Sequence, residues 1–251
     1  MLPQIKIVSV RGMISSGTGK RFMRSSSLEV SNLINEMDKD KKVAAIVVEI
    51  NSPGGSPYPC LEISETILSV KKPVVAWVRE YAASGGYWIA AACDYIVASE
   101  LSHVGSIGVI SLRPDFSSLM GMLGIEFDAV STGPRKLAGM PIVPLTEEEK
   151  DDDRNERQGT IDVVQKKFTS FISQRRRLGV DATNAVSNGQ LYLGVEALSL
   201  GLIDRIGMKE EAVSEAAGRA KVSNYHVSEA DLGKRTLLSR LVSGYKRAPI
   251  S

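Results

Sequence analysis

The residue whose setting most clearly suggests chemistry is Ser84, which stands beside two glycines in the segment YAASGGYWIA. This segment joins a β-type run, VVAWV, to a helix-type run, YWIAAACDYIVA. The backbone N–H groups just after the serine should therefore lie at the positive end of a helix. Such donors suit a nucleophile whose attack on a carbonyl group creates an oxyanion, and the N–H of Gly85 is the first candidate donor.

A second oxyanion donor is expected from the glycine pair of the segment NSPGG, Gly54 and Gly55. This segment follows the apolar run VAAIVVEI, which is typical of a strand buried on both faces. In parallel sheets, sites assemble at the carboxyl ends of the strands, where both glycine segments would lie. Neither SGG nor PGG alone identifies a site, because both occur in ordinary turns.

A serine nucleophile needs a base, and the sequence offers three candidates. His226 lies in a late polar segment without a motif and is expected at the surface. His103 follows Ser84 by 19 residues, at the start of a predicted strand, and is the more serious rival. Lys136 lies in a loop interrupted by glycine and proline rather than in a charged helix, and a lysine accepts a proton once burial lowers its pKa.

The order of predicted elements indicates an α/β fold with a largely parallel sheet. Strands are expected at VAAIVVEI, VVAWV, YIVAS, HVGSIGVI and FDAVST, with helices at CLEISETILSV and SSLMGMLGI. Thr146 is a predicted N-cap before EEEKDDD, and the helix it opens should reach about Arg177. Apolar residues recur in that helix at helical spacing: Ile161, Val164, Phe168, Phe171 and Ile172. A small α/β piece, QLYLGVEALSLGLIDRIG, and a helix from about Lys209 to Ala220 complete the core.

Length and composition indicate one compact unit, residues 1–222, followed by a basic tail, residues 223–251. The net charge is +2 and the basic residues are spread along most of the chain, so nucleic acid is not an expected partner. Cys60 and Cys93 lack metal-ligand spacing and are interpreted as buried thiols. No apolar run reaches the roughly 18 residues that a membrane span needs, and the first segment lacks the long apolar region of a signal peptide.

Four segments in this order, NSPGG, YAASGGYWIAAACDYIVAS, HVGSIGV and GQLYLGVEALSLGLIDRIG, resemble the signal peptide peptidase A family, also called protease IV. The resemblance extends from about Ile5 to Ala220. It implies the ClpP/crotonase-like fold, with repeated ββα units, a largely parallel sheet and a long C-terminal helix. It also implies a serine endopeptidase with a Ser-Lys dyad and no metal or cofactor.

The resemblance assigns roles to individual residues. Ser84 matches the nucleophile, and Lys136, 52 residues downstream, matches the general base. Ser106 of GSIGV matches the serine that holds the lysine amine, and Gly55 and Gly85 match the two oxyanion-hole amides. The histidine of ClpP-type triads would fall close to Ser106 and not on His103. Arg135, next to the lysine, is charged at any working pH and cannot act as a base.

The family's substrates imply that this chain degrades signal peptide remnants and other extended apolar peptides, bound as a strand beside NSPGG. Pro57, Tyr58 and Pro59 would lie near that groove or shape the loop before the helix. The family also implies a homo-oligomer, a ring or dome, attached to a membrane with the protease domain outside the cytoplasm. The anchor is expected to be absent from this chain.

Two other functions remain open at the level of the sequence. A crotonase-type acyl-CoA enzyme would share the fold but use carboxylates and bind CoA. A catalytically silent scaffold would keep the fold without the chemistry.

Overall fold

The computed structural model describes residues 2–17, 24–133, 135–137 and 139–230, and it divides into two compact units. The first unit comprises Met1–Ile107 and Phe171–Ser251, and the second comprises Gly108–Ser170. Where the sequence predicts one unit through residue 222, the structure thus separates a middle segment. The described residues of that segment contribute no strand to the main sheet, whose assigned strands belong to the first unit.

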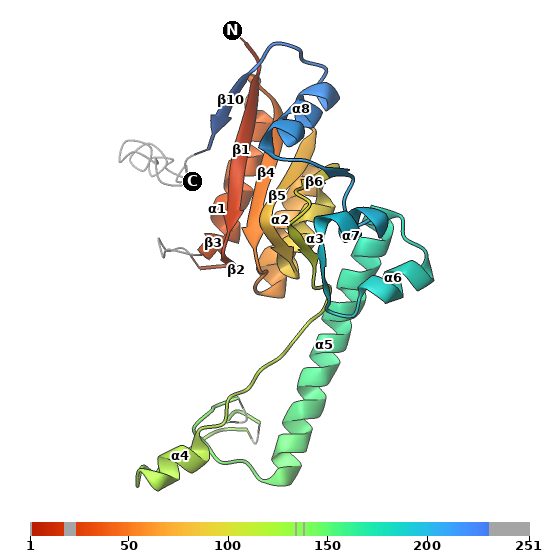
Figure 1. Ribbon diagram of the computed structural model, residues 1–251. Helices are drawn as coiled ribbons and strands as arrows, with labels where there is room; N and C mark the ends of the chain where they lie inside the picture. The colour runs from red at the N-terminus through yellow and green to blue at the C-terminus, as the bar shows by residue number, and fades with distance from the viewer. Residues whose placement is uncertain (1, 18–23, 134, 138, 231–251) are drawn as a thin grey trace, which may run out of the picture. The chain divides into compact units, whose positions relative to one another are not determined.

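The main sheet of the first unit is largely parallel, as predicted (Figure 1). Its path runs through β10 (His226–Glu229), β1 (Gln4–Arg11), β4 (Val43–Ser52), β5 (Val74–Ala83), β6 (Tyr95–Ala98) and β9 (Arg205–Ile206). The C-terminal part of β5 pairs in parallel with β7 (His103–Gly105) instead of β6. On its other side, β7 pairs antiparallel with β8 (Leu191–Leu193). A separate ribbon pairs β2 (Met13–Ser15) with β3 (Arg24–Ser26).

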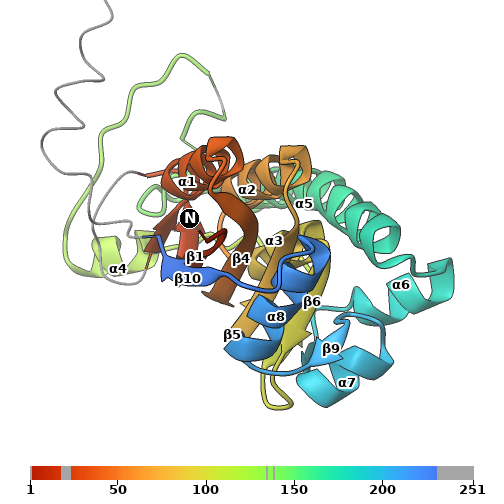
Figure 2. The same ribbon diagram turned by 90° about the horizontal axis from the view of Figure 1, so that it is seen from above.

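Helices cover both faces of this sheet, so its central strands are buried on both sides. In Figure 2, α1 (Ser27–Lys39) and α2 (Pro57–Ser69) lie on one face, with α3 (Gly85–Ala92) packed against α2, and α8 (Lys209–Arg219) lies on the other. The core beneath α8 combines strand and helix residues: Ile5, Ile7, Ala45, Val47, Val75, Trp77, Val97, Ala212, Val213, Ala216 and Ala217. The non-alternating apolar runs of β4 and β5 are explained by this double coverage.

The predicted start of the long helix is confirmed. Thr146 precedes α5 (Glu147–Arg176), its Oγ1 accepts a hydrogen bond from the N–H of Glu149 at 3.2 Å, and its own N–H donates to the Glu149 carboxylate at 2.8 Å. This reciprocal pair is a capping box, which satisfies two donors at the helix start. Arg177, with a φ of 55°, ends the helix in the left-handed conformation common after helix C-termini.

Two predictions about local structure are corrected. The segment FDAVST forms no strand, and its residues are irregular. Val130 is 96% exposed. Residues with high β propensity form a strand only where a neighbouring strand is available for pairing, and this segment has none among the described residues. The region assigned to a tail from residue 223 contains β10, which pairs with β1 through residues such as Val227 and Ile5. The basic residues from 234 onward lie outside the described residues.

Smaller helices complete the chain: α4 (Ser117–Met122) in the second unit, as predicted from SSLMGMLGI, and α6 (Val180–Val186) and α7 (Gly194–Ser199) in the first. Among the described residues, no helix is both long enough and apolar enough to cross a membrane.

The end of α5 holds two parts of the first unit together through arginines. Arg175 donates to the carbonyl groups of Ala91, Ala92 and Cys93, each at 3.0 Å, and so caps the C-terminal end of α3. Arg176 donates to both carboxylate oxygens of Asp204, at 2.8 and 3.0 Å, and its side chain is only 10% exposed.

Replacing Arg176 by methionine should lower the free energy of unfolding by roughly 3 kcal/mol, the low end of the cost of breaking a buried ion pair. Asp204 would lose its ion-pair partner in a half-buried site, where its carboxylate still accepts the N–H of Ile96 at 2.7 Å. Urea unfolding measures this change. Glu229→Gln, which removes a 63%-exposed partner of a surface pair, is the control and should cost less than about 1 kcal/mol. Equal losses in the two variants would contradict the prediction.

Candidate active site

Ser84 lies at the turn between β5 and α3, as predicted, and its backbone is fixed on both sides. Its N–H donates to the carbonyl oxygen of Gly105 at 2.8 Å, at the end of the neighbouring strand β7. Its carbonyl oxygen accepts the N–H groups of Tyr87 at 2.9 Å and Trp88 at 3.1 Å, the first bonds of α3. The serine is half-buried, whereas every residue of α3 is buried.

The backbone of Ser84 is strained, with φ 51° and ψ −121°. Among the described residues, the other non-glycine residues with positive φ are Ser106, Arg177 and Lys221. Arg177 and Lys221 follow helices, where the left-handed conformation is an ordinary cap. Ser84 and Ser106 have no such explanation. Strain of about 1–3 kcal/mol that capping does not explain is characteristic of functional sites, including the strained strand-to-helix turn that exposes a nucleophilic serine.

The burial of α3 holds this strained turn in place. The Tyr87 hydroxyl donates to the Leu202 carbonyl oxygen at 2.8 Å, and burial raises the pKa of Tyr87, so the hydroxyl stays protonated. The ring of Trp88 packs against Phe171, with centroids 5.9 Å apart. A short helix of eight residues therefore presents its N-terminus in a defined position.

The glycine loop after β4 runs directly beside this turn. Ser52 organises the loop: its hydroxyl donates to the Gly12 carbonyl oxygen at 2.6 Å and accepts the N–H of Gly54 at 3.1 Å. Gly55 forms a parallel bridge with Ile14. That bridge uses the carbonyl of Gly54, at 2.9 Å, and the N–H of Ser56, at 3.0 Å. The N–H of Gly55 therefore faces the opposite side.

The predicted oxyanion donors converge on this opposite side. A Cβ atom built on Gly85 would lie 3.5 Å from the nitrogen of Gly55, so the two backbones are in contact range. As the first residue of α3, Gly85 has an N–H without an intrahelical acceptor. The structure thus brings Ser84, Gly55 and Gly85 together.

Gly54 is a site residue that sequence reasoning left as an alternative. It has a φ of 105°, which L side chains rarely adopt, and a Cβ there would lie 2.8 Å from the Gly85 nitrogen and 3.0 Å from the Ser84 Cβ. The absent side chain is what allows the loop to approach the serine. The double glycine of NSPGG is the signal for this approach, since each of its two glycines is required for a different contact.

Ser106 also lies beside Ser84, at the end of the neighbouring strand. Ala83 pairs with Gly105, so the two serines follow paired residues. The N–H of Ser106 donates to the Gln190 carbonyl oxygen at 2.7 Å, and its φ is 49°. The first unit therefore supplies four of the five predicted site residues to one place.

The fifth, Lys136, belongs to the second unit. Its N–H donates to the Gly133 carbonyl oxygen at 3.1 Å, and its side chain is exposed. The neighbouring Arg135 is paired with Glu156 at 3.0 Å and with Asp152 at 3.6 Å, both on α5. The role of Lys136 as a base stays a prediction.

The position of His103 argues against a histidine base. Its ring stacks on Tyr81, with centroids 4.8 Å apart, and the two residues pair across β5 and β7. Tyr81 precedes Ser84 by three residues, which corresponds to about 10 Å along a strand. His226 lies exposed on β10, where its backbone N–H donates to the Pro3 carbonyl oxygen at 2.9 Å.

Glu49, the one buried carboxylate among the described residues, is fully engaged by neighbours. Burial raises its pKa, but hydrogen bonds from Arg11 and Ser9 and the charges of Arg11 and Arg79 outweigh burial and hold the pKa below the ordinary 4.5. A carboxylate held ionised in this way is poorly suited to donate a proton. The described residues also contain no group of three or more histidines, cysteines or carboxylates able to hold a metal ion.

Comparison with known families identifies the proteins that this chain resembles. The family model of Peptidase family S49 matches residues 66–223, and that of Clp protease matches residues 17–103. Over 92% of this chain, the structure superimposes on 99% of a membrane-bound stomatin-specific protease, with a TM-score of 0.56 and 16% identity. These matches confirm the predicted fold class.

Three relatives show the same likeness in sequence. A Methanocaldococcus jannaschii protein provisionally named as a protease is 34% identical over 80% of this chain and 64% of its own length. Protease 4 of Haemophilus influenzae is 31% identical over 85% of this chain and 34% of its own length. The chloroplastic serine protease SPPA of Arabidopsis thaliana is 32% identical over 96% of this chain and 36% of its own length. The chain thus spans from about one third to just under two thirds of these relatives.

Replacing Gly55 by alanine should destabilise the protein by at least about 1–3 kcal/mol, because the new Cβ would overlap backbone atoms of Ile14 that no rotamer change can move. Thermal unfolding measures the loss. Gly218→Ala in α8, where a Cβ would meet nothing within 4 Å, is the control and should instead stabilise by about 0.5–1 kcal/mol. A Gly55 variant as stable as the parent would show that the bridge to Ile14 is not formed.

The lowered pKa of Glu49 predicts a pH dependence of stability. A depressed native pKa contributes stability that is present above the ordinary value of 4.5 and is lost as the pH falls through the native value. Replacing Glu49 by glutamine should therefore cost stability at pH 7, and the difference from the parent should shrink as the pH falls below 4.5. Urea unfolding from pH 7 to about pH 3 measures this, with the exposed Glu65→Gln as control. A difference that stays constant over this range would contradict the prediction.

Proposed function

Because this chain belongs to peptidase family S49, we propose that it is a serine endopeptidase in which Ser84 is the nucleophile and Lys136 is the general base. The observation that carries the proposal is the strained Ser84 at the start of a buried helix, beside the converging backbones of Gly55 and Gly85. Amide donors fixed before the reaction stabilise a developing oxyanion without reorganisation.

The proposed reaction proceeds in two half-reactions. The neutral amine of Lys136 takes the proton of the Ser84 hydroxyl while the serine oxygen attacks the peptide carbonyl. The N–H groups of Gly55 and Gly85 donate to the resulting oxyanion. Collapse of the intermediate breaks the C–N bond, and the lysine returns the proton to the leaving amine. Water then attacks the acyl-enzyme by the same route and releases the acid and free Ser84.

Ser106 is proposed to accept a hydrogen bond from the lysine and to hold its amine toward the nucleophile. Its place beside Ser84, on the strand end that receives the Ser84 N–H, supports this role. A neutral lysine also needs a dry environment, since water favours the charged ammonium.

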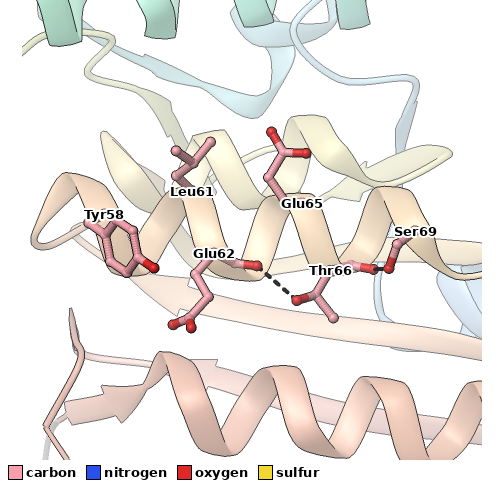
Figure 3. Close-up of a pocket in the computed structure, with 6 residues that line it drawn as sticks. All are labelled: Tyr58, Leu61, Glu62, Glu65, Thr66 and Ser69. Atoms are coloured by element: carbon pink, nitrogen blue, oxygen red, sulfur yellow. Dashed lines mark hydrogen bonds between the residues drawn. The ribbon is translucent and has the colours of Figure 1, made fainter.

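The proposed substrates are extended peptides with apolar or small side chains, including signal peptide remnants. A peptide strand could pair with the loop at Gly55, because Ile14 occupies only one side of that loop. At the start of α2, Tyr58 is 69% exposed and lines a shallow hollow on the outer helix face (Figure 3). The other residues lining this hollow are Leu61, Glu62, Glu65, Thr66 and Ser69.

A homo-oligomer, a ring or dome, is part of the proposal. Among the described residues of the second unit, Phe168 alone is buried, whereas many large apolar side chains are exposed. These are Ile110, Leu112, Phe116, Leu119, Met122, Leu123, Ile125, Phe127, Val130, Met140 and Val163. Monomeric proteins rarely expose so much apolar surface, so a second subunit is the proposed cover, and it would also shield Lys136. Membrane attachment with an extracytoplasmic protease domain is carried over from the family resemblance.

Ser84→Ala and Lys136→Ala should each lower kcat for an apolar fluorogenic peptide by at least about 10³-fold while leaving the melting temperature unchanged. Lys136→Arg, which keeps a long side chain with nitrogen donors but cannot accept a proton, should be equally inactive. A serine-directed phosphonate should label the parent at Ser84 stoichiometrically. A fully active Lys136→Ala enzyme would exclude this lysine, and stabilisation by CoA without labelling would indicate an acyl-CoA enzyme instead.

Mixing the two inactive variants separates two forms of the dyad. If serine and lysine come from different subunits, mixed oligomers should recover up to about a quarter of the parent's activity, since random pairing leaves that share of sites intact. If both come from one subunit, the mixture should stay inactive. Refolding the two variants together ensures that subunits exchange.

A further inference from the structure

The two faces of α2 differ sharply, and the inner face carries a cysteine directly behind the proposed oxyanion hole. Figure 3 shows the side chains on the outer face, most of which are polar. On the inner face, Cys60, Ile63 and Ile67 are buried, and Cys60 is fully inaccessible. A Cβ atom built on Gly85 would overlap the Cys60 sulfur, so the sulfur lies against the Gly85 Cα.

The cysteine is tied to the loop that provides the other proposed oxyanion donor. The N–H of Cys60 donates to the Ser56 carbonyl oxygen at 3.3 Å, and the N–H of Ser56 donates to Ile14 at 3.0 Å. Ser64, one turn later, donates its hydroxyl to the Cys60 carbonyl oxygen at 2.8 Å. The backbone of Cys60 is therefore tied to Ser56, the residue after Gly55, and its sulfur contacts Gly85.

The thiol acts through its volume rather than through charge. Burial raises the pKa of Cys60 to about 12, so the sulfur carries no charge near neutral pH. A neutral, buried sulfur in contact with a glycine Cα limits how far that residue can move toward α2. Neither donor backbone has a side chain of its own that could set this spacing.

We propose that Cys60 is a positioning residue of the peptidase: its sulfur sets the spacing between the Gly55 and Gly85 amides that bind the oxyanion. This inference rests on the proposed function. A bulkier side chain at position 60 moves Gly85 away from the loop, and a smaller one lets it relax inward. Both changes weaken binding of the transition state more than binding of the substrate.

The test compares variants of the two buried cysteines in the full chain. Cys93, at the other end of α3, is the matched control, since it is also buried and free but lies at the helix C-cap. Cys60→Val should lower kcat about 10- to 100-fold with little change in KM, within the range for a weakened oxyanion donor. Cys60→Ser should retain most activity, and Cys93→Val should leave kcat within about threefold of the parent.

A peptide aldehyde provides a readout that a purely structural role would not move. Its hemiacetal oxygen occupies the oxyanion position, whereas a non-hydrolysable substrate analogue makes no such contact. Across the Cys60 variants, aldehyde affinity should fall in proportion to kcat/KM, while the affinity for the analogue stays constant.

A double variant tests the contact itself. Gly85→Ala should lose activity because its Cβ overlaps the Cys60 sulfur, and adding Cys60→Ala should restore at least part of it, since only the Cys60 Cβ, 3.1 Å away, would remain close. Should Cys60→Val fail to fold, this rescue and the Cys60→Ala kinetics decide the question.

The outcomes separate this inference from the proposed function. Unchanged kcat and aldehyde affinity in every folded Cys60 variant, with Ser84→Ala inactive, would overturn the role of Cys60 alone. An equal loss of kcat in the Cys60 and Cys93 variants would likewise show that Cys60 only contributes to core packing. Full activity of Ser84→Ala would overturn the proposed function first.

Discussion

The candidate site depends on one steric constraint: three backbone segments meet at the carboxyl ends of β4, β5 and β7 with almost no side chains between them. Gly54 and Gly55 come from the first segment, Ser84 and Gly85 from the second, and Gly105 and Ser106 from the third. A Cβ atom at Gly54, Gly55 or Gly85 would meet a neighbouring backbone or the Cys60 sulfur at less than 3.0 Å. The glycines are therefore required by packing before any chemistry is considered.

The same constraint explains why strain is tolerated at the serines. A residue at φ 51° persists only where its surroundings leave no alternative. The hydrogen bond from the Ser84 N–H to Gly105, the two bonds accepted by its carbonyl, and the burial of α3 provide those surroundings. Arg175 binds carbonyl groups at the other end of α3, and these bonds oppose a shift of the helix that would relieve the turn.

Sequence reasoning predicted the first unit well because its signals are local. Its buried strands have continuous apolar runs, and its glycines mark close approaches of the backbone. In the second unit, the start of the long helix was also a local signal, because Thr146 forms its capping box with Glu149, three residues along the chain. The predicted FDAVST strand failed because its β-type residues lack a neighbouring strand, which local pattern does not report. The strand β10 was missed for the opposite reason, since its four polar-rich residues form a strand only because the edge of β1 is available. The role proposed for Cys60 could not be predicted from the sequence, because its contact with Gly85 is a tertiary contact between α2 and α3.

The proposed nucleophile and the proposed base lie in different units, and the two units differ in how much of their surface is buried. Ser84 and the amides proposed to bind the oxyanion lie in a unit with a buried hydrophobic core, so their geometry follows from the fold of that unit. Lys136 lies in a unit with one buried residue among those described, and such a unit cannot by itself supply the low-dielectric surroundings that a neutral amine requires. In the proposed mechanism, the burial that a neutral lysine requires would come from surfaces that cover the second unit. In this proposal, assembly completes the site by covering the lysine, while the amides proposed to bind the oxyanion already lie together in the first unit.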